Sequence, residues 1–273
     1  GVNITKRDES RFNDFLSMSI DVLINSDDET LKKYINENIF RTFDYILKHT
    51  KSRWMYDLYF CYFDVLSNKL RSFGVNDEKR NEIINLMTSF VAHEIKEHSS
   101  EPALLNCSIR GYFEEFSKIA QDKILSNDVK LKMIESSYSI LLEIKNLKRF
   151  SNGSKDKFFK EYIENILKFI EAKLNEIKYE DINEIIDRIY EVCRSDLHRK
   201  QSDAATIGLQ TLMKIARSAT TTIVLKEKIA TTMFKVCYHA SKNEQQNVVD
   251  TGLEMFLRFR AISSEKNIDE IYN

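Results

Sequence analysis

The sequence predicts an all-α protein of about ten or eleven antiparallel helices stacked as helical hairpins, and three observations lead to this prediction. First, the 273 residues include one proline and six glycines, whereas average usage would supply about 14 and about 19. Sheet folds depend on these residues in their many tight turns, so such folds are excluded. Second, apolar residues recur at helical spacing along the chain. Third, helix-start signals interrupt that pattern about every 25 residues.

The first four predicted helices each have an identifiable start. Residues 8–25 form the first, with an apolar stripe along one face. Ser26 and Glu29 form a predicted capping box for the second helix, in which the two side chains satisfy otherwise unpaired backbone N–H groups. Ser52 and Asn76 are the predicted N-caps of the third and fourth helices.

Similar helix-start signals recur towards the C-terminus. Pro102 lies in the first turn of the fifth helix, where its missing N–H costs nothing. Ser126 begins the sixth, and Ser151–Ser154, which contains Gly153, is the clearest predicted loop. The remaining predicted helices follow that loop, begin near residue 180, and span 202–217, 221–240 and 243–263.

Two such helices make a hairpin of roughly 50 residues, and serial hairpins with short connections stack on their neighbours as an α-solenoid. The architecture is similar to that of HEAT-like arrays, but no repeat motif identifies a family. A compact multi-helix bundle is the alternative. Because the chain becomes richer in Ala and Thr after residue 200, we expect an N-terminal array over 1–200, a C-terminal subdomain continuing it over 201–266, and a frayed tail over 267–273.

Charge and cysteine usage limit the possible function classes. Forty-one Lys and Arg residues oppose 42 Asp and Glu residues, so the whole molecule has no charge that attracts nucleic acid or anionic lipid. The four cysteines lie far apart, without metal-ligand or disulfide spacing, and we expect buried free thiols and a cytoplasmic location. No apolar run reaches a membrane span. Because the chain begins Gly1-Val2, we expect it to be a processed piece that a targeting or membrane segment could precede.

Candidate chemistry is sparse, and no catalytic, cofactor or metal residue is predicted. His93 and His98 flank Glu94, but a zinc-binding HExxH helix needs histidines four apart on one face, and these are five apart. We therefore interpret the segment as a solvated helix end. No nucleophile elbow or glycine-rich phosphate loop occurs. The sequence favours a non-enzymatic protein, although a site assembled from distant helices stays open.

Residues 54–63 are apolar and aromatic almost all round. One interpretation is a central helix covered by its neighbours. The other is that Trp54, Tyr56 or Tyr59 anchors a protein partner, since Tyr and Trp offer large rigid contact area with a polar group.

Two basic clusters interrupt the balanced charge. If hairpins stack in order, the connections that carry them lie on one edge, where they could bind phosphate groups. The residues proposed for this contact are Lys145, Lys148, Arg149, Lys155, Lys157, Lys160, Arg199 and Lys200.

The leading functional hypothesis is a helical scaffold that binds a protein or peptide, as a regulatory part of a longer chain or by itself. The alternative is a helical-repeat protein associated with nucleic acid through its basic loops.

Overall fold

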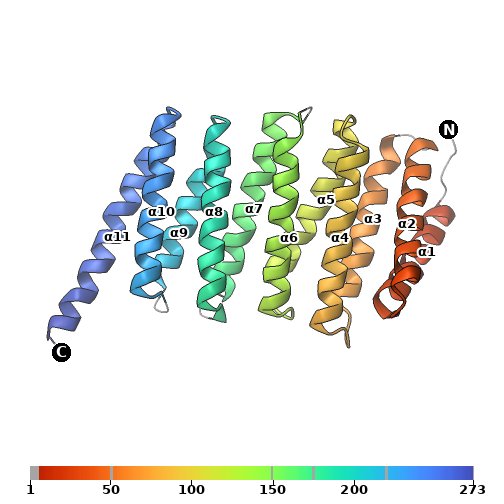
Figure 1. Cartoon of the computed structure of the whole chain (residues 1–273), viewed down its shortest axis with the longest axis horizontal. Helices are drawn as coiled ribbons and strands as arrows, with labels where there is room; N and C mark the ends of the chain where they lie inside the picture. The colour runs from red at the N-terminus through yellow and green to blue at the C-terminus, as the bar shows by residue number, and fades with distance from the viewer. Residues whose placement is uncertain (1–5, 50–51, 149, 174–175, 219–220, 273) are drawn as a thin grey trace. The chain divides into compact units, whose positions relative to one another are not determined.

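The computed structural model contains eleven α-helices and no strand among the residues that it describes (Figure 1). This confirms the all-α prediction. The described backbone covers residues 6–49, 52–148, 150–173, 176–218 and 221–272, and the described side chains exclude in addition residues 6–9, 47–49, 52–56, 152, 173 and 260–272. The chain divides into two units, Gly1–Phe150 and Ser151–Asn273.

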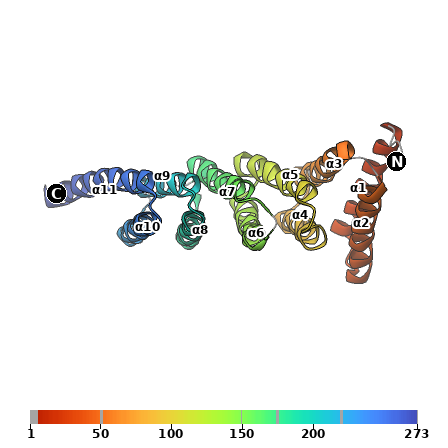
Figure 2. The same cartoon turned by 90° about the horizontal axis from the view of Figure 1, so that it is seen from above.

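The first unit is a two-layered stack of three helical hairpins. Its helices are α1 (Lys6–Asn25), α2 (Glu29–His49), α3 (Ser52–Leu70), α4 (Asp77–Glu97), α5 (Pro102–Gln121) and α6 (Asn127–Asn146). Within it, α1, α3 and α5 pack side by side in one layer, and α4 packs on α6 in the other (Figure 2). Within this unit α1, α3 and α4 thus each contact the helix two places later, which is the stacking that defines an α-solenoid.

The second unit has the same order. Its helices are α7 (Asn152–Lys173), α8 (Tyr179–His198), α9 (Asp203–Arg217), α10 (Ile223–Lys242) and α11 (Gln246–Tyr272). One layer holds α7, α9 and α11, and the other holds α8 and α10. Within each unit, stacked hairpins of HEAT-like architecture are therefore the observed arrangement.

Helix starts follow the predicted caps in most places. The Asn76 side chain accepts a hydrogen bond from the Lys79 N–H at 2.9 Å, and Ser126 accepts one from the Val129 N–H at 3.3 Å. Pro102 is the first residue of α5. The Asn76 and Ser126 side chains satisfy backbone donors that a helix start leaves unpaired.

Two predicted starts are wrong in detail. Asp28, rather than the Ser26–Glu29 box, caps α2, because its Oδ1 accepts from the N–H groups of Thr30 and Leu31. The predicted Ser151–Ser154 loop is the first turn of α7: Ser151 Oγ accepts from the Ser154 N–H and serves as the cap.

Two boundaries differ from those expected. The composition change near residue 200 falls in the connection between α8 and α9, inside the second unit. Helix α11 continues to Tyr272, through the segment 267–273 that was expected to fray, except for its last residue, which lies outside the described part. Residues 246–272 contain no proline, and their one glycine is packed, so nothing in the sequence stops the helix at residue 263.

Three glycines inside helices allow close contacts between neighbouring helices. A Cβ added to Gly111 of α5 would lie 2.7 Å from the Phe63 ring of α3, and one added to Gly208 of α9 would lie 2.3 Å from Cys193 Sγ of α8. Gly252 of α11 meets Cys237 of α10 in the same way. Since real Cβ contacts are not this short, these helices approach more closely than any larger residue would permit.

All four cysteines carry free thiols, as predicted. Cys193 is buried, whereas Cys61, Cys107 and Cys237 are only half-buried, which corrects the expectation that all four are buried. Among the described residues, none of the helices combines the length and apolar character that a membrane crossing requires.

Candidate functional site

The aromatic segment of α3 is a core element where the structure describes its side chains. Tyr59, Tyr62 and Phe63 are at most 1% exposed, and their rings surround Phe90 of α4. This confirms the covered-helix interpretation for that part. Tyr59 is therefore not available to anchor a partner. The Trp54 and Tyr56 side chains lie outside the described residues.

Tyr59 instead belongs to a buried polar cluster that sequence reasoning missed. Its hydroxyl donates a hydrogen bond to Glu94 Oε2 of α4, and Glu94 is fully buried. Three further side chains complete this group, which we call the Glu94 cluster: Asp44 of α2, His93 of α4, and His98, the residue after α4.

The Glu94 cluster brings nitrogen and oxygen atoms together at one point. Asp44 Oδ1 lies 3.8 Å from His93 Nε2 and 3.5 Å from His98 Nε2. One ligand atom from each of Asp44, His93 and Glu94 can be chosen so that all three lie within 4.8 Å of one another. His/carboxylate groups at this spacing are the usual donor set of a transition-metal site.

Four atoms of the cluster are buried without a hydrogen-bond partner: Asp44 Oδ1, His93 Nε2, Glu94 Oε1 and His98 Nε2. An unsatisfied buried polar group costs about 1–3 kcal/mol, so four in one place are unusual in a stable core. Glu94 also lacks a permanently charged partner there. Burial raises its pKa to about 7, against which the Tyr59 hydrogen bond and the nearby His98 act.

His98 reaches the cluster because it is not helical. As the C-cap of α4 it has φ −112° and ψ 21°, and its N–H bonds to the Glu94 carbonyl. Its side chain therefore does not point in the direction that a continued helix would give position 98. His98 is 8% exposed and Glu94 is fully buried, so the predicted solvated helix end is wrong.

Aromatic rings hold α2 against α4 beside the cluster. Phe40 stacks on His93, with ring centroids 4.5 Å apart and an interplanar angle of 18°, and Phe43 packs edge-on against Phe90. These ring contacts join α2 to α4 next to the Glu94 cluster.

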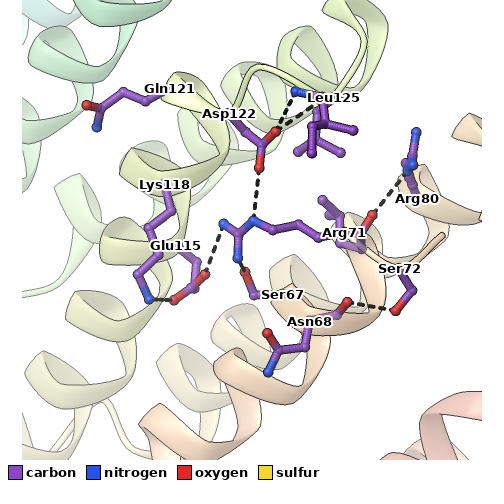
Figure 3. A network of polar contacts seen from close by, with 12 residues as sticks. Ser67, Asn68, Arg71, Ser72, Arg80, Glu115, Lys118, Gln121, Asp122 and Leu125 are labelled. Atoms are coloured by element: carbon purple, nitrogen blue, oxygen red, sulfur yellow. Dashed lines mark hydrogen bonds and ion pairs between the residues drawn. The ribbon is translucent and has the colours of Figure 1, made fainter.

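A second buried carboxylate in the same unit has a different environment. Glu115 of α5 faces the Arg71 guanidinium at 3.9 Å and accepts a hydrogen bond from Lys118 (Figure 3). Arg71 also donates to Asp122 at 3.0 Å and to Ser67 at 2.7 Å. This Arg71 network pairs its buried acid with permanent cations.

The predicted basic residues at the end of the first unit are exposed where they are described. Lys145 and Lys148 lie at the end of α6 and just after it. Lys148 borders a surface hollow with Ser99 and Asn146. Arg149 lies outside the described residues.

The basic residues of the second unit come together, but several pair with acids. Arg199 donates to Asp156 at 2.9 Å, lies 3.6 Å from Asp196, and stacks over the Phe159 ring at 4.0 Å. Lys155 is 7% exposed, and burial first, then the nearby Arg199, lowers its pKa. The predicted proximity of residues 155–160 to residues 199–200 is thus observed, with Arg199 turned inward.

The other basic residues of this cluster are less buried. Lys157 and Lys160 form ion pairs with Glu161 at 3.7 Å and with Asp203 at 3.5 Å. Lys200 is exposed and has a positive φ of 60°.

A groove of about 330 Å³ lies between α9 and α11. Met213 and Met255 contribute its apolar surface, and the cationic residues Lys214, Arg217 and Arg258 line it with Gln210. Two of these cations are paired, Lys214 with Glu171 and Arg258 with Glu254.

No protein-family model and no curated protein matches this chain. Among solved structures, it is similar to the crystal structure of the karyopherin Kap121p bound to the SUMO protease Ulp1p, with 13% sequence identity and a TM-score of 0.26. The match covers 84% of this chain and 26% of that one, so the chain spans about a quarter of the karyopherin's length.

Proposed function

We propose that this chain is a non-enzymatic helical-repeat protein that binds a protein segment in the groove between α9 and α11. The observation that carries the proposal is that one groove holds a partly exposed methionine and an arginine without an ion-pair partner. Met255 offers polarizable surface that adapts to varied apolar side chains, whereas Met213 of the same lining is 2% exposed. Arg217 lines the same groove and has no ion-pair or hydrogen-bond partner among the described residues.

This chemistry fits an amphipathic helical segment. An apolar side chain of the partner would contact Met255, and a carboxylate one turn away would pair with Arg217, in the helix-in-groove mode of recognition. Glu171 and Glu254 pair with the other two cations. The groove therefore lacks the continuous positive surface that a phosphate backbone prefers.

The experiment uses the full chain and a labelled helical peptide with Leu at i and i+4 and Glu on the flanking positions. Fluorescence anisotropy should show binding that weakens about tenfold with Arg217→Glu, since reversing one partner of a charge pair costs more than about 1.4 kcal/mol. A peptide with Lys in place of Glu should bind less tightly. Arg41→Glu, at a side chain that is 75% exposed in the first unit, is the matched control and should leave binding unchanged.

Equal affinity of wild type and Arg217→Glu for the peptide would overturn the proposal. A labelled nucleic-acid duplex tests the alternative under the same conditions. If the duplex binds at physiological salt and Lys200→Glu weakens it while the peptide does not bind, the nucleic-acid hypothesis replaces this one.

A further inference from the structure

The Glu94 cluster gathers carboxylate and imidazole groups without a permanent cation. Asp44 Oδ1, His93 Nε2, Glu94 Oε1 and His98 Nε2 are all buried without hydrogen-bond partners. One of the carriers, Glu94, is fully buried, and His98 is 8% exposed. A single cation placed among Asp44, His93 and Glu94 would contact one ligand atom of each, and it would supply the positive charge that the buried carboxylate lacks.

The spacing suits a small tetrahedral ion. Metal–ligand bonds of about 2.0–2.1 Å to nitrogen or oxygen place the ligand atoms of a tetrahedron about 3.4 Å apart. Asp44 Oδ1 is 3.5 Å from His98 Nε2 and 3.8 Å from His93 Nε2, and Glu94 offers an oxygen within 4.8 Å of the Asp44 and His93 atoms. A shift of a few tenths of an ångström would bring Asp44 and His93 to the spacing of two ligands of one ion, and Glu94 would approach by at most about 1.4 Å.

The surroundings orient the ligands as the outer shell of a metal site does. Tyr59 donates to Glu94 Oε2, while Oε1 has no hydrogen-bond partner. Phe40 stacks on His93 and fixes the plane of that ring.

The donor types select the class of ion. Ca²⁺ and Mg²⁺ prefer six or more oxygen ligands, whereas an imidazole nitrogen with two carboxylate oxygens favours Zn²⁺ and its neighbours in the transition series. We propose that Asp44, His93 and Glu94 form a structural binding site for a Zn²⁺-type divalent ion that joins α2 to α4. The proposal is independent of the peptide-binding function, which concerns the other unit.

The test measures zinc retained by the full chain. The protein is stripped with chelator, dialysed against Zn²⁺, passed through a desalting column and measured by inductively coupled plasma mass spectrometry. We expect one equivalent per chain, a rise in melting temperature on adding Zn²⁺, and with Co²⁺ the visible absorption of a tetrahedral site. Asp44→Asn and Glu94→Gln preserve side-chain shape and should each weaken zinc binding by about a hundredfold, and Tyr59→Phe, which removes only the orienting hydrogen bond, by about tenfold.

Two controls keep the outcome interpretable. Glu115→Gln removes a buried carboxylate of the same unit that faces Arg71 instead, and zinc retention should not change. Circular dichroism of each variant without metal identifies any that fails to fold, in which case His93→Asn replaces it. No retained zinc in the wild type, or retention that is the same in a folded ligand variant as in the wild type, overturns the proposal.

Discussion

Glu94 and Glu115 are buried carboxylates in the same unit, yet their neighbours differ in kind. Glu115 faces Arg71 and Lys118, whose charges are permanent at neutral pH (Figure 3). Glu94 faces a tyrosine, an aspartate and two histidines. A buried charge persists only when it is paired, protonated or bound to a cation. The Arg71 network has its counter-charge built in, whereas the Glu94 cluster must take up a proton or a metal ion.

The largest expected effect comes from removing the built-in cation. Arg71→Met leaves Glu115 and Asp122 without their guanidinium, and breaking a buried pair in this way costs about 3 kcal/mol. Because Arg71 is partly exposed, we expect a loss of about 2 kcal/mol in the free energy of unfolding. In metal-free protein, Glu94→Gln should change it by less than about 1 kcal/mol, since no permanent pair is broken.

Urea denaturation followed by circular dichroism measures both variants. The comparison between the two carboxylates fails if Arg71→Met is neutral, or if Glu94→Gln without metal is the more destabilised of the two.

Asp196 of the second unit extends the comparison, because it is buried and shares Arg199 with Asp156. Burial raises its pKa from 3.8 to about 6, against the Ala205 N–H bond and the Arg199 charge. The folded chain therefore binds a proton that the unfolded chain lacks between about pH 4 and pH 6, so Asp196 contributes less stability as the pH rises through that window. Relative to Asp196→Asn, the wild type should gain about 2 kcal/mol on acidification from pH 6 to pH 4.

Denaturation of the two proteins at several pH values tests this prediction. A difference in unfolding free energy that stays constant from pH 4 to pH 7 would show that Arg199 keeps Asp196 ionised throughout.

The helix order and several caps could be predicted from sequence because both depend on local patterns. Asn76 and Ser126 cap the helices that follow them, and Pro102 opens one. The Glu94 cluster could not be found in the same way. Its members come from three places: Asp44, about 50 residues earlier in the chain, the last turns of α4, and the cap residue His98.

The interpretation of Tyr59 failed for a related reason. A stretch that is apolar all round does not show which hydroxyl meets a buried acid on the next helix. Arg199 likewise belongs to a basic run in sequence, while its partner Asp156 lies 43 residues away. Contacts between helices decide whether a charged side chain is exposed to solvent or paired in the core.

The smallest expected effect concerns the close approach of α8 and α9 at Gly208, which differs from the contact between α2 and α4 that aromatic rings fill. Gly208→Ala places a methyl group 2.3 Å from Cys193 Sγ, and such overpacking costs about 1–3 kcal/mol. The higher helix propensity of alanine offsets about 1 kcal/mol of this cost, so we expect a net loss of about 1 kcal/mol in the free energy of unfolding. Cys193→Ala in the same chain removes the sulfur, and the double variant should be less destabilised than the two single losses added together. Gly153→Ala, where a Cβ meets nothing within 4 Å, is the matched control and should not destabilise the protein. If Gly208→Ala is as harmless as Gly153→Ala, the close contact between α8 and α9 does not limit the size of the side chain at position 208.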